Sequence, residues 1–158
     1  MSRAGVASAV LGALLVASLA SPAHADTGDD EDIAPQIVAT MAEVPGGVIV
    51  DPNHAVWPGL GMEVVVPASA GLSARSAVGG CVSGRVCVFT GASASGAVLS
   101  WSTCGYHAIP GSFAARSIAN ARSAGTAHAR AGTTALAVAA AGTWANISGS
   151  ADNVMCYF

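Results

Sequence analysis

Residues 80–105 read GCVSGRVCVFTGASASGAVLSWSTCG, and this stretch predicts the fold of the chain. Two runs of alternating apolar residues, one ending at Phe89 and one at Trp101, are separated by a glycine-rich turn. Strands bounded by glycine turns and linked by cysteines are typical of small disulfide-bonded β domains. We therefore expect residues 81–158 to form an all-β domain. Three of the four cysteines of the chain lie in this stretch: Cys81, Cys87 and Cys104.

The predicted domain divides into two comparable halves, each reading as strand, glycine turn, strand, loop and short strand. Such duplication predicts two Greek-key motifs packed face to face. Trp101 and Trp144 occupy similar places in the two halves, and we expect both to pack in the core. The first half has strands at 86–89, 97–101 and 117–118, with a loop through Tyr106 and Pro110. The second half has strands at 126–131, 136–141 and 154–158.

The first 25 residues have the pattern of a secretory signal peptide. Arg3 precedes an apolar run over residues 4–20, and Ala23-His24-Ala25 fits a signal-peptidase site that would leave Asp26 as the first mature residue. A membrane anchor is disfavoured because the run, about 17 residues, is shorter than the roughly 20 that a spanning helix needs. We expect a secreted chain with no membrane insertion after cleavage.

Residues 26–80 form an acidic N-terminal segment ahead of the domain. They carry eight carboxylates against one arginine, a net charge of −7, whereas residues 81–158 carry a net charge of +3. We expect residues 26–32 to be a solvated, disordered tail, with electrostatic folding back onto the domain as the alternative. A short helix follows, with apolar residues at helical spacing over 33–44, then a small β-meander over 48–66 and a small-residue linker over 68–79.

All four cysteines follow the predicted cleavage site and would meet oxidising conditions, so we expect disulfides. Four cysteines allow three pairings. We favour Cys81–Cys87, because the four intervening residues can turn and bring the sulfurs across a hairpin. The remaining pair, Cys104–Cys156, would join the chain end to the centre of the domain. Metal ligation is disfavoured because the chain has no Cys-x-x-Cys and no suggestive histidine spacing.

The cysteine stretch resembles the Streptomyces metalloproteinase-inhibitor family of peptidase inhibitors, whose members look like CPSGYVCLY…GR.L.F.DCG. The matching residues are CVSGRVCVF at 81–89, GAVLSW at 96–101 and Cys104-Gly105. The upstream PGGV at 45–48 and NHAVWPG at 53–59 resemble the PGG…N.V.W.GG segment that often precedes this domain. The resemblance implies a βγ-crystallin-like fold, in which Phe89 and Gly96 match the motif aromatic-x4-aromatic-x-Gly, with Ala94 at the second aromatic position.

The resemblance also implies a secreted inhibitor of peptidases, with metalloproteases of the thermolysin type as first target. Such an inhibitor blocks the active site with a rigid loop, whose ordering cost on binding is low. In the family's best-known form, the loop lies in the second motif and is closed by a disulfide, whereas residues 130–144 of this chain contain no cysteine. The inhibitory loop and the target therefore stay open. The alternatives are a crystallin-like structural or cell-surface protein and a small secreted toxin or antimicrobial.

Few residues of the domain carry catalytic or metal-binding chemistry. An enzyme needs a nucleophile with a base, or paired carboxylates, whereas Asp152, His107 and His128 show no informative spacing, so we expect no catalysis. By resemblance, Asp152 and Asn153 are calcium candidates, although one carboxylate falls short of the six or more oxygens that calcium takes. We expect no cofactor. The dispersed arginines lack interleaved aromatics, which disfavours nucleic acid as a partner.

Overall fold

The structure, a computed structural model, describes residues 32–67 and 76–158. The predicted signal peptide, residues 26–31 of the predicted tail and residues 68–75 of the predicted linker lie outside the described residues. The described part is mostly antiparallel β-sheet with one short α-helix, so the all-β prediction is confirmed. No helix among the described residues has the length and apolar character needed to cross a membrane.

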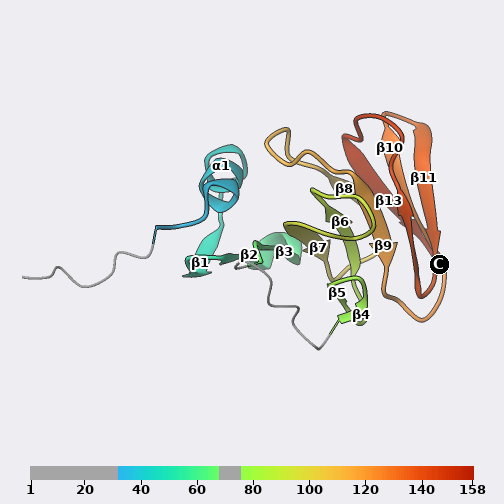
Figure 1. The fold of residues 1–158 in the computed structure, drawn as a ribbon, viewed down its shortest axis with the longest axis horizontal. Coiled ribbons are helices and arrows are strands. Elements are labelled where there is room, and N and C mark those ends of the chain that lie inside the picture. Colours follow the sequence, from blue (N-terminus) through green and yellow to red (C-terminus); the bar gives the residue numbers. More distant parts are fainter. Residues whose placement is uncertain (1–31, 68–75) are drawn as a thin grey trace, which may run out of the picture. The chain divides into compact units, whose positions relative to one another are not determined.

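Two sheets face each other as neighbouring layers (Figure 1). The larger sheet contains, in spatial order, β1 (Val48–Asp51), β2 (His54–Trp57), β3 (Met62–Val65), β7 (Val98–Trp101), β6 (Val86–Phe89), β9 (Ser117–Asn120) and β12 (Thr143–Asn146). The smaller sheet contains β11 (Thr134–Ala140), β10 (Thr126–Ala131), β13 (Asn153–Tyr157) and β8 (Tyr106–Ala108). A separate ribbon pairs β4 (Ser76–Val78) with β5 (Cys81–Val82).

The two halves of the sequence exchange their third strands. In the first half, β9 pairs with β6 and β6 with β7, while β8 joins the sheet of the second half. In the second half, β13 pairs with β10 and β10 with β11, while β12 joins the sheet of the first half. Each sheet therefore contains a strand from the other half, and neither sheet is complete without it.

The core lies between the sheets and is built from aliphatic and small side chains. Val86, Val88 and Ile118 of the larger sheet and Val154 of the smaller sheet are fully buried in it. The buried positions of β10, Ala127 and Ala129, are alanines that pack in the same core. This packing explains how a chain with few aromatics fills its interior.

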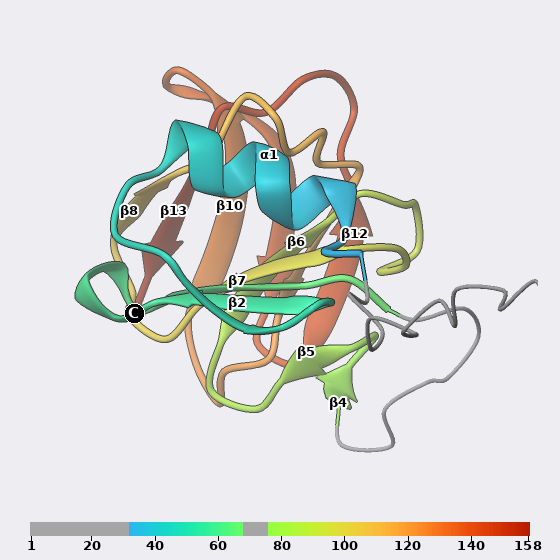
Figure 2. The ribbon, with the colours of Figure 1, turned by 90° about the vertical axis from the view of Figure 1, so that its left-hand side faces the viewer.

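The N-terminal meander extends the larger sheet. Strand β3 pairs with β7, which places Met62 opposite Trp101 and Val64 opposite Leu99. Helix α1 (Pro35–Glu43), seen in Figure 2, begins with a proline in its first turn, where the missing N–H costs nothing. It buries Ile37 in the core cluster that also contains Trp57 of β2. The indole Nε1 of Trp57 donates to the Val44 carbonyl at 2.9 Å, which joins the helix end to the sheet. The predicted helix and meander are confirmed, and they share one compact unit, Glu31–Phe158, with the domain.

Three short strands, β4, β8 and β12, lie where we predicted irregular chain, and β12 is placed by its pairing with β9. Residues 76–78 of the predicted linker form β4, which pairs with β5. As a result, β5 does not pair with β6 as a hairpin, although the turn between them is present and the disulfide between Cys81 and Cys87 forms. The predicted loop through Tyr106 contains β8, which is placed by its pairing with β13.

The prediction for the two tryptophans holds for one of them. Trp101 is buried, as expected, whereas Trp144 is 44% exposed, and its predicted core position is wrong. Trp144 lies opposite Ala119 on the edge strand β12, and Ala119 belongs to a second cluster on the outer face of the sheet. Ala94 is buried in the same cluster, and a Cβ on Gly79 would collide with it, so the β4–β5 turn fills the space of the expected second aromatic.

Candidate functional site

The loop over residues 102–105 joins β7 to β8 and lies at the surface. Three of its four backbone carbonyls accept hydrogen bonds from other parts of the molecule. Ser102 donates its N–H to the Gly61 carbonyl at 2.9 Å. The Thr103 carbonyl lies 3.0 Å from Nε2 of His107, and the Gly105 carbonyl accepts from the N–H of Cys156 at 2.9 Å. The side chains of Ser102 and Thr103 face solvent. The loop is therefore presented outward while its backbone is fixed from behind.

Both favoured disulfides are present among the described residues, and no described cysteine is free. Cys104 bonds to Cys156, so the exposed loop is tied to β13 across a sequence separation of 52. Cys81 bonds to Cys87 across a separation of 6, next to the turn that contains Gly84. The Cys104–Cys156 bond fixes the loop directly. The Cys81–Cys87 bond fixes the neighbouring turn that contains Gly84.

Arg122 connects three segments around the loop. Its Nη1 donates to the Ser102 carbonyl at 3.4 Å and to the Gly84 carbonyl at 3.3 Å. Its guanidinium carbon lies 5.1 Å from the centre of the Phe158 ring, within cation–π range. No sequence motif indicated this residue, because its partners are backbone atoms far apart along the chain. We call this surface the loop end: residues 58–61, Gly84, residues 102–105, Arg122 and Phe158.

Large apolar side chains are exposed at and beside the loop end. Leu60 is 51% exposed, Tyr106 is 62% exposed and Phe158 is 91% exposed. Aromatic and arginine side chains of this kind are enriched in protein–protein interfaces. The loop end thus combines a rigid loop with side chains suited to contact another protein.

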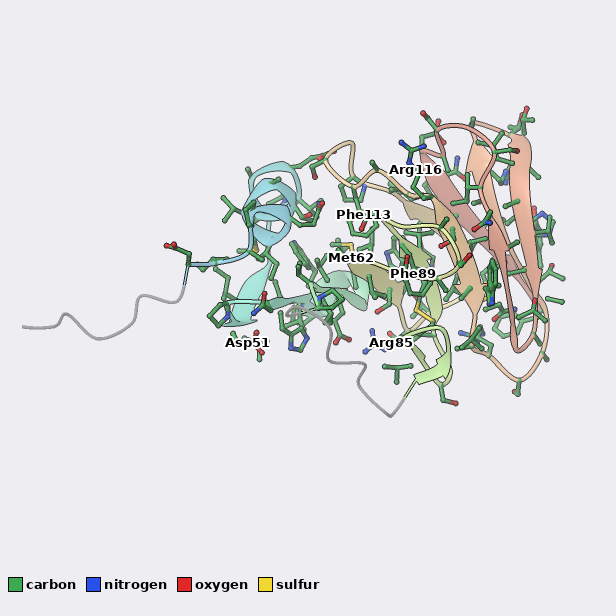
Figure 3. The ribbon with its side chains drawn as sticks, in the orientation of Figure 1. Asp51, Met62, Arg85, Phe89, Phe113 and Arg116 are labelled. Carbon is green, nitrogen blue, oxygen red and sulfur yellow. A yellow bond between two sulfur atoms is a disulfide. The ribbon has the colours of Figure 1, made fainter. Side chains whose placement is uncertain are left out.

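A cleft of about 300 Å³ opens beside the loop end. Its floor is built from buried side chains, among them Met62, Trp101 and Ile109, with Leu60 and Tyr106 at the mouth. In Figure 3, Met62 lies on the side of the sheet that holds Phe113. The cleft was not predicted, because its residues come from α1, the β2–β3 turn, β7 and β8.

His107 forms part of the cleft wall. Its ring lies flat on Trp101, with 5.1 Å between centroids and 14° between planes. Burial lowers the pKa of His107, although its contact with the Thr103 carbonyl acts in the opposite direction. At neutral pH this histidine is therefore a neutral, stacked side chain, placed far more firmly than a polar loop residue would be.

Glu43, the last residue of α1, stands at the rim of the cleft. Its carboxylate accepts the N–H of Gly111 at 2.5 Å and the N–H of Ser112 at 2.9 Å. These backbone hydrogen bonds, with that of Ser112 the larger contribution, lower the pKa of Glu43. The carboxylate joins the helix to the loop after β8 and remains ionised at neutral pH.

A chain of charged groups lies on the outer face of the larger sheet. Nε2 of His54 lies 2.9 Å from one Glu63 oxygen without hydrogen-bond alignment, and the other Glu63 oxygen lies 2.9 Å from Arg85. Arg85 also donates to the hydroxyl of Ser100 at 3.1 Å. Figure 3 shows Asp51 and Arg85 on this side of the sheet. These contacts join β2, β3, β7 and the residue that precedes β6. We therefore assign these polar side chains a structural role.

The calcium candidates Asp152 and Asn153 hold the β10–β11 turn. Both oxygens of Asp152 lie 3.0 Å from the Gly132 N–H, and the side-chain amide of Asn153 donates to the Gly132 carbonyl at 2.9 Å. Ser117 holds the β6–β7 turn in a comparable way, by accepting the N–H of Ala94 and donating to the Gly91 carbonyl. Within the described residues, no group of three or more His, Cys, Asp or Glu side chains is arranged to hold a metal.

The remaining residues that the sequence singled out lie apart from the loop end or serve its packing. His128 contacts the hydroxyl of Thr126 at 3.1 Å and meets the Tyr157 ring edge-on at 4.9 Å. The second-half region 130–144, where the resemblance places the inhibitory loop, contains the end of β10, all of β11 and the start of β12, with the turns between them. The disulfide-tied loop of this chain lies instead in the first half, at residues 102–105.

Comparison of the chain with protein-family models, with curated proteins and with solved structures gives no match in any of the three.

Proposed function

We propose that this chain is a secreted peptidase inhibitor that binds metalloproteases through its loop end. The loop over residues 102–105 enters the active-site cleft of the peptidase, and the surrounding exposed side chains contact the rim. In this mechanism the chain acts by binding and performs no catalysis of its own.

One observation carries the proposal: the loop is exposed and yet already ordered. The carbonyls of Ser102, Thr103 and Gly105 are bonded to the rest of the molecule, and Cys104 is covalently tied to β13. Ordering a flexible side chain or loop on binding costs roughly 0.5–1.5 kcal/mol for each immobilised side chain. A loop that is ordered before binding avoids much of this cost, and it resists cleavage because it cannot distort readily in the active site.

The strand order supports a crystallin-like double Greek-key fold, which the family resemblance implies. In a Greek key the fourth strand lies beside the first, as β9 lies beside β6 and β13 beside β10. The two halves then interlock by exchanging β8 and β12. The meander β1–β3 is an addition at one edge of this arrangement.

Export is supported by the signal-like N-terminus and by the cysteines. Both disulfides require an oxidising compartment to persist. An exported inhibitor meets peptidases outside the cell, which is consistent with a secreted peptidase as partner.

The proposal is tested by titrating the full chain, secreted with its own leader, against a thermolysin-type metalloprotease and a subtilisin-type serine protease. We expect a break in residual activity near one-to-one stoichiometry with the metalloprotease. Thr103→Arg should weaken inhibition at least tenfold, which corresponds to about 1.4 kcal/mol. Ser150→Arg is the matched control, since Ser150 is an exposed hydroxyl residue between β12 and β13, outside both the loop end and residues 130–144.

Equal inhibition by the two variants would show that the loop at 102–105 is not the contact. If neither peptidase is inhibited by the folded chain, the proposal fails, and the structural-protein and toxin alternatives take its place.

A further inference from the structure

We propose that the cleft beside the loop end is a docking site for one arginine or lysine side chain of the partner protein. The identity of the partner rests on the proposed function, whereas the class of side chain follows from the cleft itself. The site is continuous with the loop end: Leu60 precedes Gly61, which bonds Ser102, and Tyr106 follows directly after the loop.

The walls of the cleft fit the alkyl part of such a side chain. The floor is apolar, with Met62, Trp101 and Ile109 each buried, and the exposed side chains of Leu60 and Tyr106 flank the entrance. Arginine and lysine place their methylene stems along apolar surface while the charged head reaches a polar rim. The Tyr106 ring also offers an aromatic face to a cation.

The charge of the cleft selects a cation over a neutral apolar group. Among the described residues that line it, Glu43 is the one that is ionised at neutral pH. Gly111 and Ser112 each donate one hydrogen bond to its carboxylate, which has about four acceptor positions, so it retains capacity for a guanidinium or ammonium group. His107 in the wall is neutral at this pH because burial lowers its pKa, so it does not repel the cation.

The cleft is large enough to admit one arginine or lysine side chain. A volume of about 300 Å³ lies at the lower end of the range for small-molecule pockets. An arginine side chain that enters from a partner docked on the loop end would fit within this volume without rearrangement of the floor.

The experiment uses butylguanidinium chloride as a mimic of the arginine side chain and butylurea as its uncharged counterpart. Each is titrated into the full chain while amide resonances are followed by NMR. We expect saturable, millimolar binding of butylguanidinium, with shifts at residues 106–108, and at least fivefold weaker binding of butylurea. Glu43→Gln, which keeps a side-chain oxygen for Gly111 or Ser112, should weaken butylguanidinium binding at least fivefold. Asp51→Asn, which removes a carboxylate on the opposite side of the sheet, should leave it unchanged.

Tyr106→Ala and Leu60→Ala provide a test that does not touch the helix junction at Glu43. Both substitutions should weaken the binding of butylguanidinium, while the amide resonances of residues away from the cleft stay unchanged. Equal binding of the two probes, absence of saturable shifts, or wild-type binding by both mouth variants would each overturn the docking site. Because no peptidase is present, probe binding without peptidase inhibition would refute only the proposed function. Inhibition without probe binding would refute only the docking site.

Discussion

Removal of the Cys104–Cys156 disulfide should destabilise the protein more than removal of Cys81–Cys87. The first bond spans a sequence separation of 52 and the second a separation of 6. In the chain-entropy model the stabilisation grows with the logarithm of the closed loop, which gives about 4 kcal/mol for the first bond and about 2 kcal/mol for the second. The double variants Cys104→Ala/Cys156→Ala and Cys81→Ala/Cys87→Ala compare them directly.

Burial of the sulfur atoms reduces the difference between the two variants. Cys81 and Cys87 are both fully buried in the outer-face cluster with Phe89, whereas in the other pair Cys156 is buried but Cys104 is only half-buried. Removing buried sulfur atoms therefore adds a packing cost of about 1 kcal/mol to the loss of stability of Cys81→Ala/Cys87→Ala. The variant of the longer loop should still be the less stable by about 1 kcal/mol.

Urea unfolding at neutral pH measures both values, with the fluorescence of the buried Trp57 and Trp101 as the signal. Wild type and both variants should unfold in a single transition with similar dependence on urea, so that the midpoints report stability. An equal or smaller loss for the longer loop would refute the reasoning, because it would mean that closure entropy does not dominate in this chain.

Three further changes test the contacts that position the site. Arg122→Ala removes two hydrogen bonds to backbone carbonyls, so it should cost about 1 kcal/mol in urea unfolding and speed amide exchange in residues 102–105; unchanged exchange would contradict its role. Glu43→Gln should destabilise the protein at neutral pH, because the pKa of Glu43 is lower in the folded state than in the unfolded state. The stability difference between wild type and variant should shrink as the pH falls below about 4.5, and it should vanish below the folded-state pKa. A difference that does not change with pH would exclude the charge of Glu43 as its cause. Ser117→Ala leaves two backbone groups of the β6–β7 turn without their partner and should cost about 1–3 kcal/mol by thermal or urea unfolding, whereas a loss below about 0.5 kcal/mol would show that the turn does not depend on it.

The strands with regular patterns were predictable from the sequence. Val86–Phe89 and Thr126–Ala131 were located at their observed bounds, because each is a run that pairs on both sides and ends at a turn with glycine. Both disulfide pairs could also be predicted from the sequence. The short spacing favours Cys81–Cys87, and the two remaining cysteines then form the second pair. Local signals of this kind are independent of how distant segments meet.

The misses arise where tertiary contacts override local pattern. Strand β8 has only three residues with no apolar alternation, and its pairing with β13 places it. Trp144 was expected in the core because of its place in the repeat, but β12 is an edge strand and its outer face is open. The cleft and the role of Arg122 have no sequence signal, because each depends on backbone atoms or side chains from separate segments.

The candidate site depends on both the N-terminal meander and the strands of residues 81–158. Pairing of β3 with β7 brings the turn at Leu60 next to the loop at Ser102, and it brings the end of α1 next to the segment after β8. A domain that began at residue 81 would leave β7 as an open edge and would lose Trp57, Met62 and Val64 from the core. It would also lose one wall of the cleft and the bond that Gly61 makes to the loop. The N-terminal part from α1 to β3 therefore belongs to the binding surface, and its removal should abolish the proposed inhibition even where the loop and its disulfide are kept.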